Sequence, residues 1–313
     1  MPTLPLFTPP PANAHASASR QVIAPGGTEW WHVDAEDRTS GLLVVAGLFA
    51  GSPFDSIYQQ QVRRFLNNPT VMCPPHPRDH AIASVAVYRD GICIGSLEER
   101  VPRNAFSASP TMLDVRCGPL QLAAAGKSIR VKCESSDLNE SPSLDLTFTP
   151  RLSVSAGEFR ISTLGRPGTF LNWICGAPSY DVTGEIQTTN DSGLAETLEF
   201  KGRGFHECTF AAGLLARELD GWTRRRVIGD ARTWVSHRFA FHGKSASSLF
   251  FAATSTDARW VSLDADKWPE VEALGRHIET ETYLPMKRTA GDVKIEHVSA
   301  RSLIECDSEN YSS

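Results

Sequence analysis

Short apolar segments separated by turn residues run through most of the chain. Runs of four to nine apolar and β-branched residues recur, and examples are GLLVVAGLF, LDVRCGPLQLAA, SIRVKCE, LDLTFTP, ETLEFKGRGF, RTWVSHRFAFHG and SLFFAATS. Runs of this length and composition, bounded by clusters of turn residues, are typical of β-strands. The pattern predicts an all-β protein with few short helices.

One hairpin and two helices can be placed on this pattern. In VAVYRDGICIG, apolar positions alternate on both sides of Asp90-Gly91, a dipeptide that favours tight hairpin turns. The segments 62–68 and 266–277 each predict a short helix, the second with Pro269 in its first turn. Strands at this spacing without alternating helices favour a sandwich or a barrel, and a barrel with a wide mouth is a common way to hold an apolar ligand.

Charge and hydropathy exclude some classes of partner. The chain has 313 residues, a net charge of −5 and a pI of about 6.0, so it lacks the basic surplus of a nucleic-acid binder. Its basic run, Arg224-Arg225-Arg226, is short and is typical of a solvated turn. No apolar run reaches the roughly 18 residues that a membrane-spanning helix needs. We therefore expect no nucleic acid and no integral membrane segment, while the oligomeric state stays open.

The N-terminus and the cysteines indicate a cytoplasmic protein. Residues 1–20 contain several prolines and no early Lys or Arg, which argues against a secretory signal and predicts a flexible lead-in. The seven cysteines include no CxxC pair, so a zinc ribbon or a disulfide scaffold is disfavoured. Most of them are expected to be small buried hydrophobes, and no metal is expected.

The first group of candidate functional residues lies in GGTEWWHVDA. Side chains alternate along a strand, so Glu29 and Trp31 share one face while Trp30 and His32 share the other. One indole then packs in the core and the other lines a cavity, with Glu29 or His32 beside it to orient a ligand. The structural alternative is a core tryptophan with a hydrogen-bonded Glu or His.

The second group is GRGFHECTF, residues 202–210. Two glycines two positions apart in a strand indicate a bulge or a close approach of the backbone to a bulky group. His206 and Cys208 share one face and Glu207 lies on the other, unless a bulge re-aims them. Because i and i+2 side chains of a strand lie about 6–7 Å apart, a His206–Cys208 nucleophile pair is disfavoured, and a zinc site would need further ligands.

The third group is TWVSHRF, residues 233–239. It predicts a strand with Trp234, Ser236 and Arg238 on one face, whereas His237 is typical of a surface or core histidine. The chain contains no phosphate-cradling glycine loop, no GxSxG elbow and no HExxH pattern.

Taken in order, these groups resemble a known family. EWWHVDA is followed by Trp173, Pro178, Val182 and Gly184 in a W-x4-P-x3-V-x-G pattern, and then by GRGFHE and TWVSHRF. This order, which covers roughly residues 22–265, resembles the lipocalin-like superfamily of carotenoid 1,2-hydratases (hydroxyneurosporene synthases) and AttH-like proteins.

The resemblance implies two lipocalin-like β-barrel or sandwich halves packed together, with a ligand in the N-terminal half or between them and no cofactor. We accordingly expect a lead-in at residues 1–20 and β domains at residues 21–200 and 201–313. The family carries out acid-catalysed addition of water to carotenoid or terpenoid double bonds. It also includes fungal enzymes of polyketide and terpenoid pathways that close rings by Diels–Alder and hetero-Diels–Alder reactions.

The sequence departs from the hydratase pattern in its second group. The hydratase box Y-H-D-H-N-W-G corresponds here to FHECTF, in which His206 is kept, Glu207 replaces Asp, and the later polar residues are lost. Protonating an alkene needs a precisely placed acid, whereas a pericyclase needs a preorganised site with one or two hydrogen bonds. We therefore predict a cofactor-free pericyclase acting on a hydrophobic polyketide or terpenoid. A hydratase, dehydratase or isomerase and a non-catalytic lipophile carrier are the alternatives.

These assignments define the expected site. The candidate catalytic residues are Glu207, His206 and Glu29. A Glu207 carboxyl walled by Phe205 and Phe210 would favour its neutral form and could donate a proton; the alternative is an ion pair with Arg203 or Arg238. The candidate substrate-binding residues are Trp30, Trp31, His32, Trp173, Phe205, Cys208, Trp234, Ser236 and Arg238.

Overall fold

The computed structural model divides the chain into two compact units, Met1–Leu214 and Leu215–Ser313. It describes residues 14–135, 141–152, 156–162, 169–190, 192–213, 215, 219–228, 232–241, 247–254, 258–264, 278–283, 286–289, 292–295 and 299–302. Of residues 158–162 and of most residues beyond 218, the backbone alone is described.

The first unit is built on one large antiparallel sheet. Its strands are β1 (Thr28–Asp37), β2 (Leu42–Ala50), β3 (Ala81–Arg89), β4 (Ile92–Val101), β5 (Phe106–Ala108), β6 (Asp114–Cys117), β7 (Leu120–Ala125), β8 (Ser128–Cys133), β9 (Ser143–Pro150), β10 (Gly157–Ser162), β11 (Phe170–Thr189) and β12 (Ala195–Ala212). They lie in the order β4-β3-β2-β1-β12-β11-β9-β8-β7-β6-β5, and β10 pairs with β11. The helical elements between them are short: α1 (Ser56–Asn67), η1 (Pro77–His80) and η2 (Arg103–Ala105). The predicted all-β class is confirmed.

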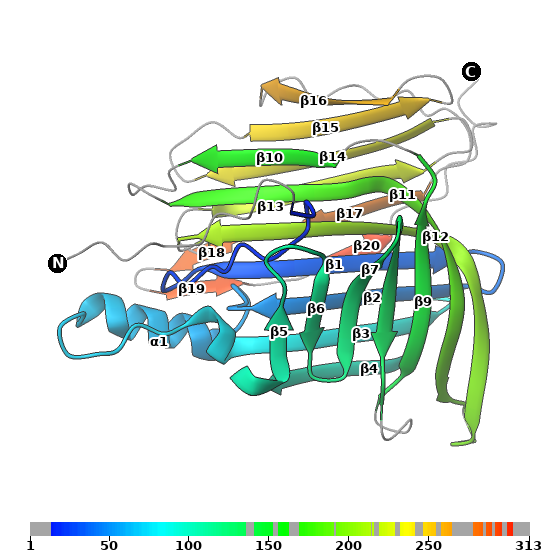
Figure 1. The fold of residues 1–313 in the computed structure, drawn as a ribbon, viewed down its shortest axis with the longest axis horizontal. Coiled ribbons are helices and arrows are strands. Elements are labelled where there is room, and N and C mark those ends of the chain that lie inside the picture. Colours follow the sequence, from blue (N-terminus) through cyan, green and yellow to red (C-terminus); the bar gives the residue numbers. More distant parts are fainter. Residues whose placement is uncertain are drawn as a thin grey trace. The chain divides into compact units, whose positions relative to one another are not determined.

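The large sheet folds over on itself. Figure 1 shows β5 to β9 lying across β1 to β4, while the long strands β11 and β12 curve from one layer into the other. The Thr188 hydroxyl of β11 donates a hydrogen bond to the backbone oxygen of Ile94 on the edge strand β4, 3.0 Å away. The first unit is therefore a nearly closed barrel.

The pairing of β11 with β12 is irregular in its middle part, which allows the two strands to curve. Their register shifts between Cys175 and Ala177 and again between Ala177 and Tyr180, and such irregularities bend strands. On β12, a Cβ atom added at Gly204 would lie 2.6 Å from a ring carbon of Phe148. The close backbone approach that the glycine pair predicts is confirmed.

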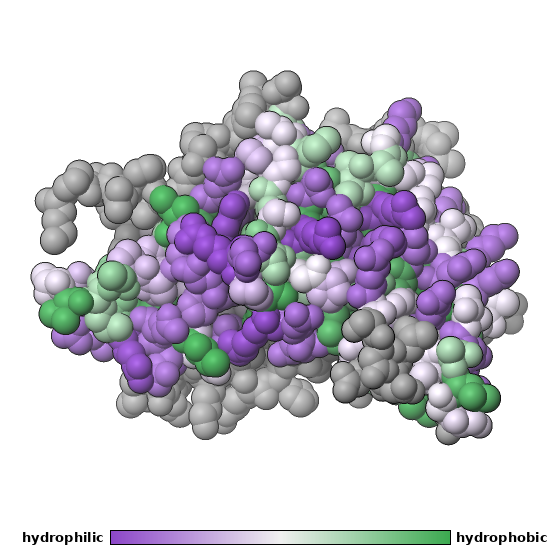
Figure 2. Space-filling view, turned by 60° about the horizontal axis from the view of Figure 1, so that its bottom comes forward, coloured by the Kyte–Doolittle hydropathy of each residue, from purple (hydrophilic) through white to green (hydrophobic). Residues whose placement is uncertain are grey.

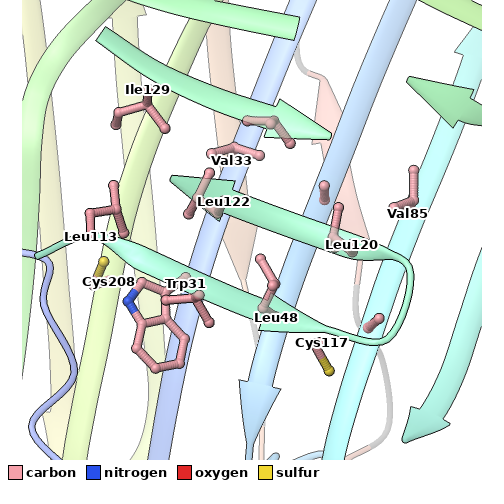
Figure 3. Close-up of a cluster of buried hydrophobic side chains, with 14 of the residues drawn as sticks. Trp31, Val33, Leu48, Val85, Leu113, Cys117, Leu120, Leu122, Ile129 and Cys208 are labelled. Carbon is pink, nitrogen blue, oxygen red and sulfur yellow. The ribbon is translucent and has the colours of Figure 1, made fainter. Parts of the chain in front are cut away.

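The hydrophobic core fills the space between the two layers. Figure 3 shows Leu120 and Leu122 of β7 in the same cluster as Trp31, Val33 and Leu48 of β1 and β2. Trp31 is fully buried there. Residues on alternate positions of β1 face this core, so we call that side of the sheet its inner face and the opposite side its outer face.

The predicted hairpin and the first predicted helix are both present. Asp90 and Gly91 form the turn between β3 and β4 with φ values of 52° and 81°, the left-handed conformation that an Asp-Gly hairpin turn requires. The helix expected over residues 62–68 is the second half of α1. This helix begins earlier, where the Asp55 side chain caps it by accepting a hydrogen bond from the Ile57 amide at 2.9 Å.

Residues 14–21 differ from the flexible lead-in that the sequence predicts. Ser17, Ala18, Ser19 and Arg20 are buried. Backbone hydrogen bonds of 2.9 Å join this segment to the loop between β5 and β6, from His15 to Thr111 and from Ser19 to Ser109. We call residues 14–21, dark blue in Figure 1, the N-terminal strap. Residues 1–13 lie outside the described part of the chain.

The second unit contains a six-stranded antiparallel sheet and a small hairpin. The strands of the sheet lie in the order β16 (Ala258–Asp264), β15 (Ser247–Thr254), β14 (Arg232–Phe241), β13 (Leu219–Ile228), β17 (Ile278–Tyr283) and β20 (Ser299–Ser302). The hairpin pairs β18 (Met286–Thr289) with β19 (Asp292–Ile295). The helix expected at 266–277 lies outside the described residues. The domain division at residues 200 and 201 stays a prediction, and this position falls within β12.

The surface, the helices and the cysteines of the described residues can be compared with what a membrane segment or a metal site requires. On the face shown in Figure 2, hydrophilic residues predominate and hydrophobic residues form separate small areas. Within the described ranges, no helix is both long enough and apolar enough to span a membrane. Nor do three or more His, Cys, Asp or Glu side chains in this part of the chain gather as metal ligands. The cysteines described there are free thiols, and Cys117, Cys133, Cys175 and Cys208 are buried.

Candidate functional site

Strand alternation distributes the predicted site residues over the two faces of the sheet. β1 pairs with β12 in a regular register that sets His32 opposite Glu207 and Trp31 opposite Cys208. Directly opposed residues of an antiparallel pair point to the same side. His206 and Cys208 therefore face the barrel interior together with Trp31, whereas Glu207 lies on the outer face, as the sequence predicts for a regular strand.

Glu29 belongs to the interior group and binds the N-terminal strap. Its carboxylate accepts hydrogen bonds from the Arg20 amide at 2.7 Å and from the Ser19 hydroxyl at 2.9 Å, and Arg78 Nη2 lies 3.9 Å away. Burial raises the pKa of the Glu29 carboxyl, while the Arg78 charge and these hydrogen bonds act in the opposite direction. In this structure Glu29 anchors the strap to the start of β1.

His206 is the second anchor of the strap. Its Nδ1 donates to the backbone oxygen of His32 at 3.0 Å, so its Nε2 carries the lone pair that accepts the Ser17 hydroxyl at 3.1 Å. Burial lowers the pKa of His206 to about 4, and this neutral tautomer satisfies both contacts. The Trp31 indole adds a third tie, because its Nε1 donates to the Ser17 backbone oxygen at 2.9 Å.

The Cys208 Sγ lies 3.5 Å from the His206 Nε2, so the prediction that strand spacing keeps these two side chains out of hydrogen-bond reach is wrong, because both side chains lean toward each other along the strand. Burial raises the pKa of the Cys208 thiol, which disfavours the thiolate that a nucleophile requires. The interior group therefore consists of Ser17, Ser19, Glu29, His206 and Cys208, and its described contacts hold the strap on the barrel.

Glu207 accepts a buried hydrogen bond that the sequence did not predict. The Trp173 indole Nε1 donates to Glu207 Oε2 at 2.7 Å, and both side chains are buried. Arg203 forms its ion pair with Asp181. Phe210, which was expected to wall the carboxyl group, points instead into the barrel because it has the opposite parity on β12. Its ring there contacts Trp31, with 5.6 Å between the ring centroids.

His32 and Asp34 extend the polar row of the outer face. His32 Nε2 lies 3.2 Å from Asp34 Oδ2, two positions along β1. Because His32 is directly opposite Glu207, an imidazole and two carboxyl groups lie on neighbouring strands of one face. This combination can donate and accept protons.

An aromatic row runs beside these polar residues. Thr209 of β12 is opposite Trp30 on β1 and Trp173 on β11, so the two indoles flank it on the same face. Trp30 also stacks on Phe49 of β2, with 5.2 Å between the rings, and meets Phe54 edge-on at 5.7 Å. We call Trp30, His32, Asp34, Trp173, Glu207 and Thr209 the outer-face cluster.

Exposure changes systematically across this cluster. Trp30 and His32 on β1 are partly exposed, whereas Glu207 on β12 is 4% exposed and Trp173 on β11 is fully buried. The partly exposed indole of Trp30 lies diagonally across from Glu207, a spacing of about 7–8 Å between the two positions. The arrangement combines an aromatic binding surface with an acid in a poorly solvated position.

The third predicted group lies in the second unit. Trp234, Ser236 and Arg238 are on β14, where they pair with Ala252, Phe250 and Ser248 of β15. The backbone alone is described for these three residues. Phe205 lies on the outer face of β12 opposite Asp34 and is fully buried.

Sequence reasoning missed Asp34, Thr209 and the strap residues. Asp34 and Thr209 have the same strand parity as His32 and Glu207, so alternation alone could have added them. The strap could not be found in this way, because Ser17 and Ser19 lie in a segment without periodicity and their partners are distant in sequence.

Comparison with known proteins finds one similar curated sequence and several solved structures with a similar fold. No family model matches the sequence. The chain is 24% identical over 215 residues to Hydroxyneurosporene dehydrogenase from Chlorobaculum tepidum, which is 66% of this chain and 54% of that protein. The chain thus spans about half the length of this curated relative.

The solved structures similar to the chain include CghA. A crystal structure of CghA with Sch210972 matches with a TM-score of 0.54 at 10% identity, covering 93% of this chain and 89% of CghA. The chain has a lipocalin-like fold. A second CghA crystal structure matches with a TM-score of 0.51 at 11% identity, covering 92% and 88% of the two chains. Together with the sequence relative, these likenesses confirm the resemblance to the lipocalin-like hydratase superfamily that the motifs predict.

Proposed function

We propose that this protein is a cytoplasmic, cofactor-free cyclase that closes a ring in a hydrophobic polyketide or terpenoid by a Diels–Alder or hetero-Diels–Alder reaction. The observation that carries the proposal is the outer-face cluster. In it a buried carboxyl group, fixed by an indole N–H, lies beside an aromatic row and opposite an imidazole. The likeness in fold to CghA, which is known with Sch210972, supports a small molecule as the substrate.

The outer-face cluster suits a reaction that needs positioning more than strong acid. A Diels–Alder closure converts three π bonds into one π bond and two σ bonds, so no atom is gained or lost. Trp30 and Phe49 offer flat apolar surfaces that hold a folded conjugated chain with its reacting ends together.

Glu207 supplies the electrostatic part of this mechanism. As a neutral carboxylic acid it donates a hydrogen bond to a carbonyl group conjugated with the reacting alkene, which lowers the barrier to ring closure. The Trp173 N–H holds the carboxyl group in one orientation, so little reorganisation is needed in the transition state. The His32–Asp34 pair lies on the opposing strand, where it can accept a hydrogen bond from a hydroxyl group of the substrate.

Hydration is the second candidate, because the motifs resemble those of carotenoid 1,2-hydratases (hydroxyneurosporene synthases) and the sequence relative, which matches over 66% of this chain, is named for hydroxyneurosporene. In that case Glu207 would protonate an alkene and water would add to the cation. A lipophile carrier is the third candidate, in which the same surface binds without reaction.

Mass spectrometry of the reaction products separates the three candidates. Purified protein is incubated with a synthetic linear triene that carries an activated alkene, and in parallel with neurosporene in detergent. We expect a ring-closed isomer of unchanged mass from the triene. A gain of one water from neurosporene would support hydration instead, and recovery of both probes unchanged from tightly bound complexes would support a carrier.

Substitution of Glu207 tests its role. Glu207→Gln keeps the size of the side chain and removes the acid, so we expect about a 10²-fold loss of rate with little change in probe affinity. Trp173→Phe removes only the N–H donor and should give a smaller loss of rate. Glu199→Gln is the matched control, since Glu199 lies exposed on the same strand. Wild-type turnover by Glu207→Gln would eliminate the proposed acid.

A further inference from the structure

A second feature of the first unit lies next to the outer-face cluster but takes no part in it. The segment 56–72 contains α1 and the loop that follows it, and we call it the α1 segment. It connects β2 to β3 and begins two positions after Phe54, whose ring meets the Trp30 indole edge-on. The start of the α1 segment is therefore adjacent to the aromatic row.

The α1 segment exposes apolar side chains at two separate points. Val71 in the loop is 84% exposed and Ile57 in the first turn of α1 is 49% exposed. Phe65 and Met72 are partly exposed as well. Figure 2 shows hydrophobic surface at the left end of the molecule, the end at which Figure 1 places α1.

Packing against the barrel buries only one side of α1. Tyr58 and Val62, one turn apart, are buried. The Tyr58 hydroxyl also donates to the Gly27 oxygen at 2.9 Å, which ties α1 to the barrel. The residues that protrude, Ile57 and Val71, are not needed to hold the helix in place.

The charge of the α1 segment is opposite to that of the whole chain. The protein carries a net charge of −5, yet this segment contains Arg63 and Arg64 and no acidic residue. Arg64 is exposed in the last turn of α1. Exposed apolar side chains near arginines, here Ile57 on α1 and Val71 in the loop after it, supply the two contributions that attract a segment to an anionic bilayer, apolar burial and electrostatic attraction.

We propose that the α1 segment docks on an anionic lipid membrane, with Ile57 and Val71 inserted among the acyl chains and Arg63 and Arg64 facing lipid phosphates. Docking in this way would bring the aromatic row next to a membrane from which an apolar substrate can be taken. Uptake of a substrate from the membrane rests on the proposed function, whereas binding of the α1 segment to the membrane does not.

Vesicle flotation tests the proposal directly with the full-length chain. Wild-type protein is mixed with vesicles of phosphatidylcholine alone, or with about 30% phosphatidylglycerol, at low and high salt. We expect binding to the anionic vesicles that salt weakens, because the attraction acts within a Debye length of about 10 Å at 0.1 M salt. No binding to anionic vesicles at low salt would refute the proposal.

Matched variants identify the surface that binds. Val71→Asp removes an inserted side chain, and the double change Arg63→Glu with Arg64→Glu should weaken vesicle binding about fivefold or more for each arginine. Ile92→Asp and Arg116→Glu are controls, since Ile92 is 70% exposed at the start of β4 and Arg116 is exposed on β6. Equal losses in the controls and in the α1 variants would overturn the assignment.

The outcome is separable from the proposed function. Turnover of a detergent-dissolved probe by Val71→Asp should equal that of wild type, because the substrate then needs no membrane. If wild type binds vesicles but converts no probe, the docking surface stands and the proposed cyclase does not.

Discussion

Neighbouring residues of β12 have opposite surroundings. His206 faces the packed interior, where it holds the strap and β1 together, while Glu207 lies on the outer face with Trp173 and His32 around it. The two adjacent candidate catalytic residues thus lie on opposite faces of the sheet, as strand alternation predicts. We expect substitutions at His206 to affect stability and those at Glu207 to affect chemistry.

The pH dependence of stability tests the role of His206. Its pKa is about 4 in the folded chain against an ordinary value of 6.5, because burial disfavours the charged ring. The contribution of neutral His206 is fully present above pH 6.5 and is lost as the pH falls from 6.5 towards 4, since the unfolded chain takes up the proton first. The shift corresponds to about 3 kcal/mol, which is lost in full only below about pH 4, where the folded chain is protonated as well.

Urea unfolding at pH 7.5 and pH 5 measures this contribution. His206→Asn keeps a donor near the position of Nδ1 and removes the titration. We expect its free energy of unfolding to fall less between the two pH values than that of wild type. Equal falls in both proteins would show that another group is responsible.

The face of the sheet on which a residue lies could be predicted from the sequence. The residues that it contacts on other strands could not. Alternation correctly separates Trp30 from Trp31 and His206 from Glu207, because the period of a strand is fixed by its backbone. The Trp173–Glu207 hydrogen bond depends on the pairing of β11 with β12, which spans 34 positions and has two register shifts. A single sequence contains no information on such shifts.

Among the elements, β11 and β12 do most to shape the barrel. Each contributes to both layers, and the glycines of β12 let neighbouring groups approach its backbone. The glycine pattern predicts this approach, and the Asp-Gly pattern predicts the hairpin. The strap had no such pattern, because it is ordered by buried anchors and not by its own conformational preferences.

Substitution of Gly204 tests how tightly β12 is packed. In Gly204→Ala the new Cβ would lie 2.6 Å from both Phe148 and Val182, which are core residues. We expect a loss of about 1–3 kcal/mol in the free energy of unfolding, the usual cost of overpacking. Gly95→Ala is the control, because its Cβ would lie 3.3 Å or more from the nearest atoms. Thermal unfolding of both variants gives the comparison, and equal stabilities would contradict the packing argument.

At the scale of the whole molecule, the described hydrophobic core cluster belongs to the first unit. It extends from Val22 to Ala212. This cluster and the pairing of β1 with β12 make the first unit self-contained in its sheet. The family resemblance predicts two domains. The position of the boundary between them depends on where β12 ends, which the resemblance does not give.

Truncation tests these limits. We expect residues 1–214 to fold alone and to unfold cooperatively in urea, because every strand of the large sheet is retained. Residues 1–200 end inside β12 and lack His206, Cys208 and Phe210, so this fragment should be aggregated or unfolded. Near-ultraviolet circular dichroism distinguishes the outcomes. A folded 1–200 fragment would place the boundary where the sequence predicts it.

The strap also has a consequence for the order of events during synthesis. Ser17 leaves the ribosome well before its partner His206, which follows 189 positions later. Glu29 is available to the strap almost at once, whereas the second anchor exists only after β12 has emerged. Contacts of such long sequence separation slow folding, since the intervening chain must be ordered first. The first described residues to be translated are therefore among the last to reach their final place.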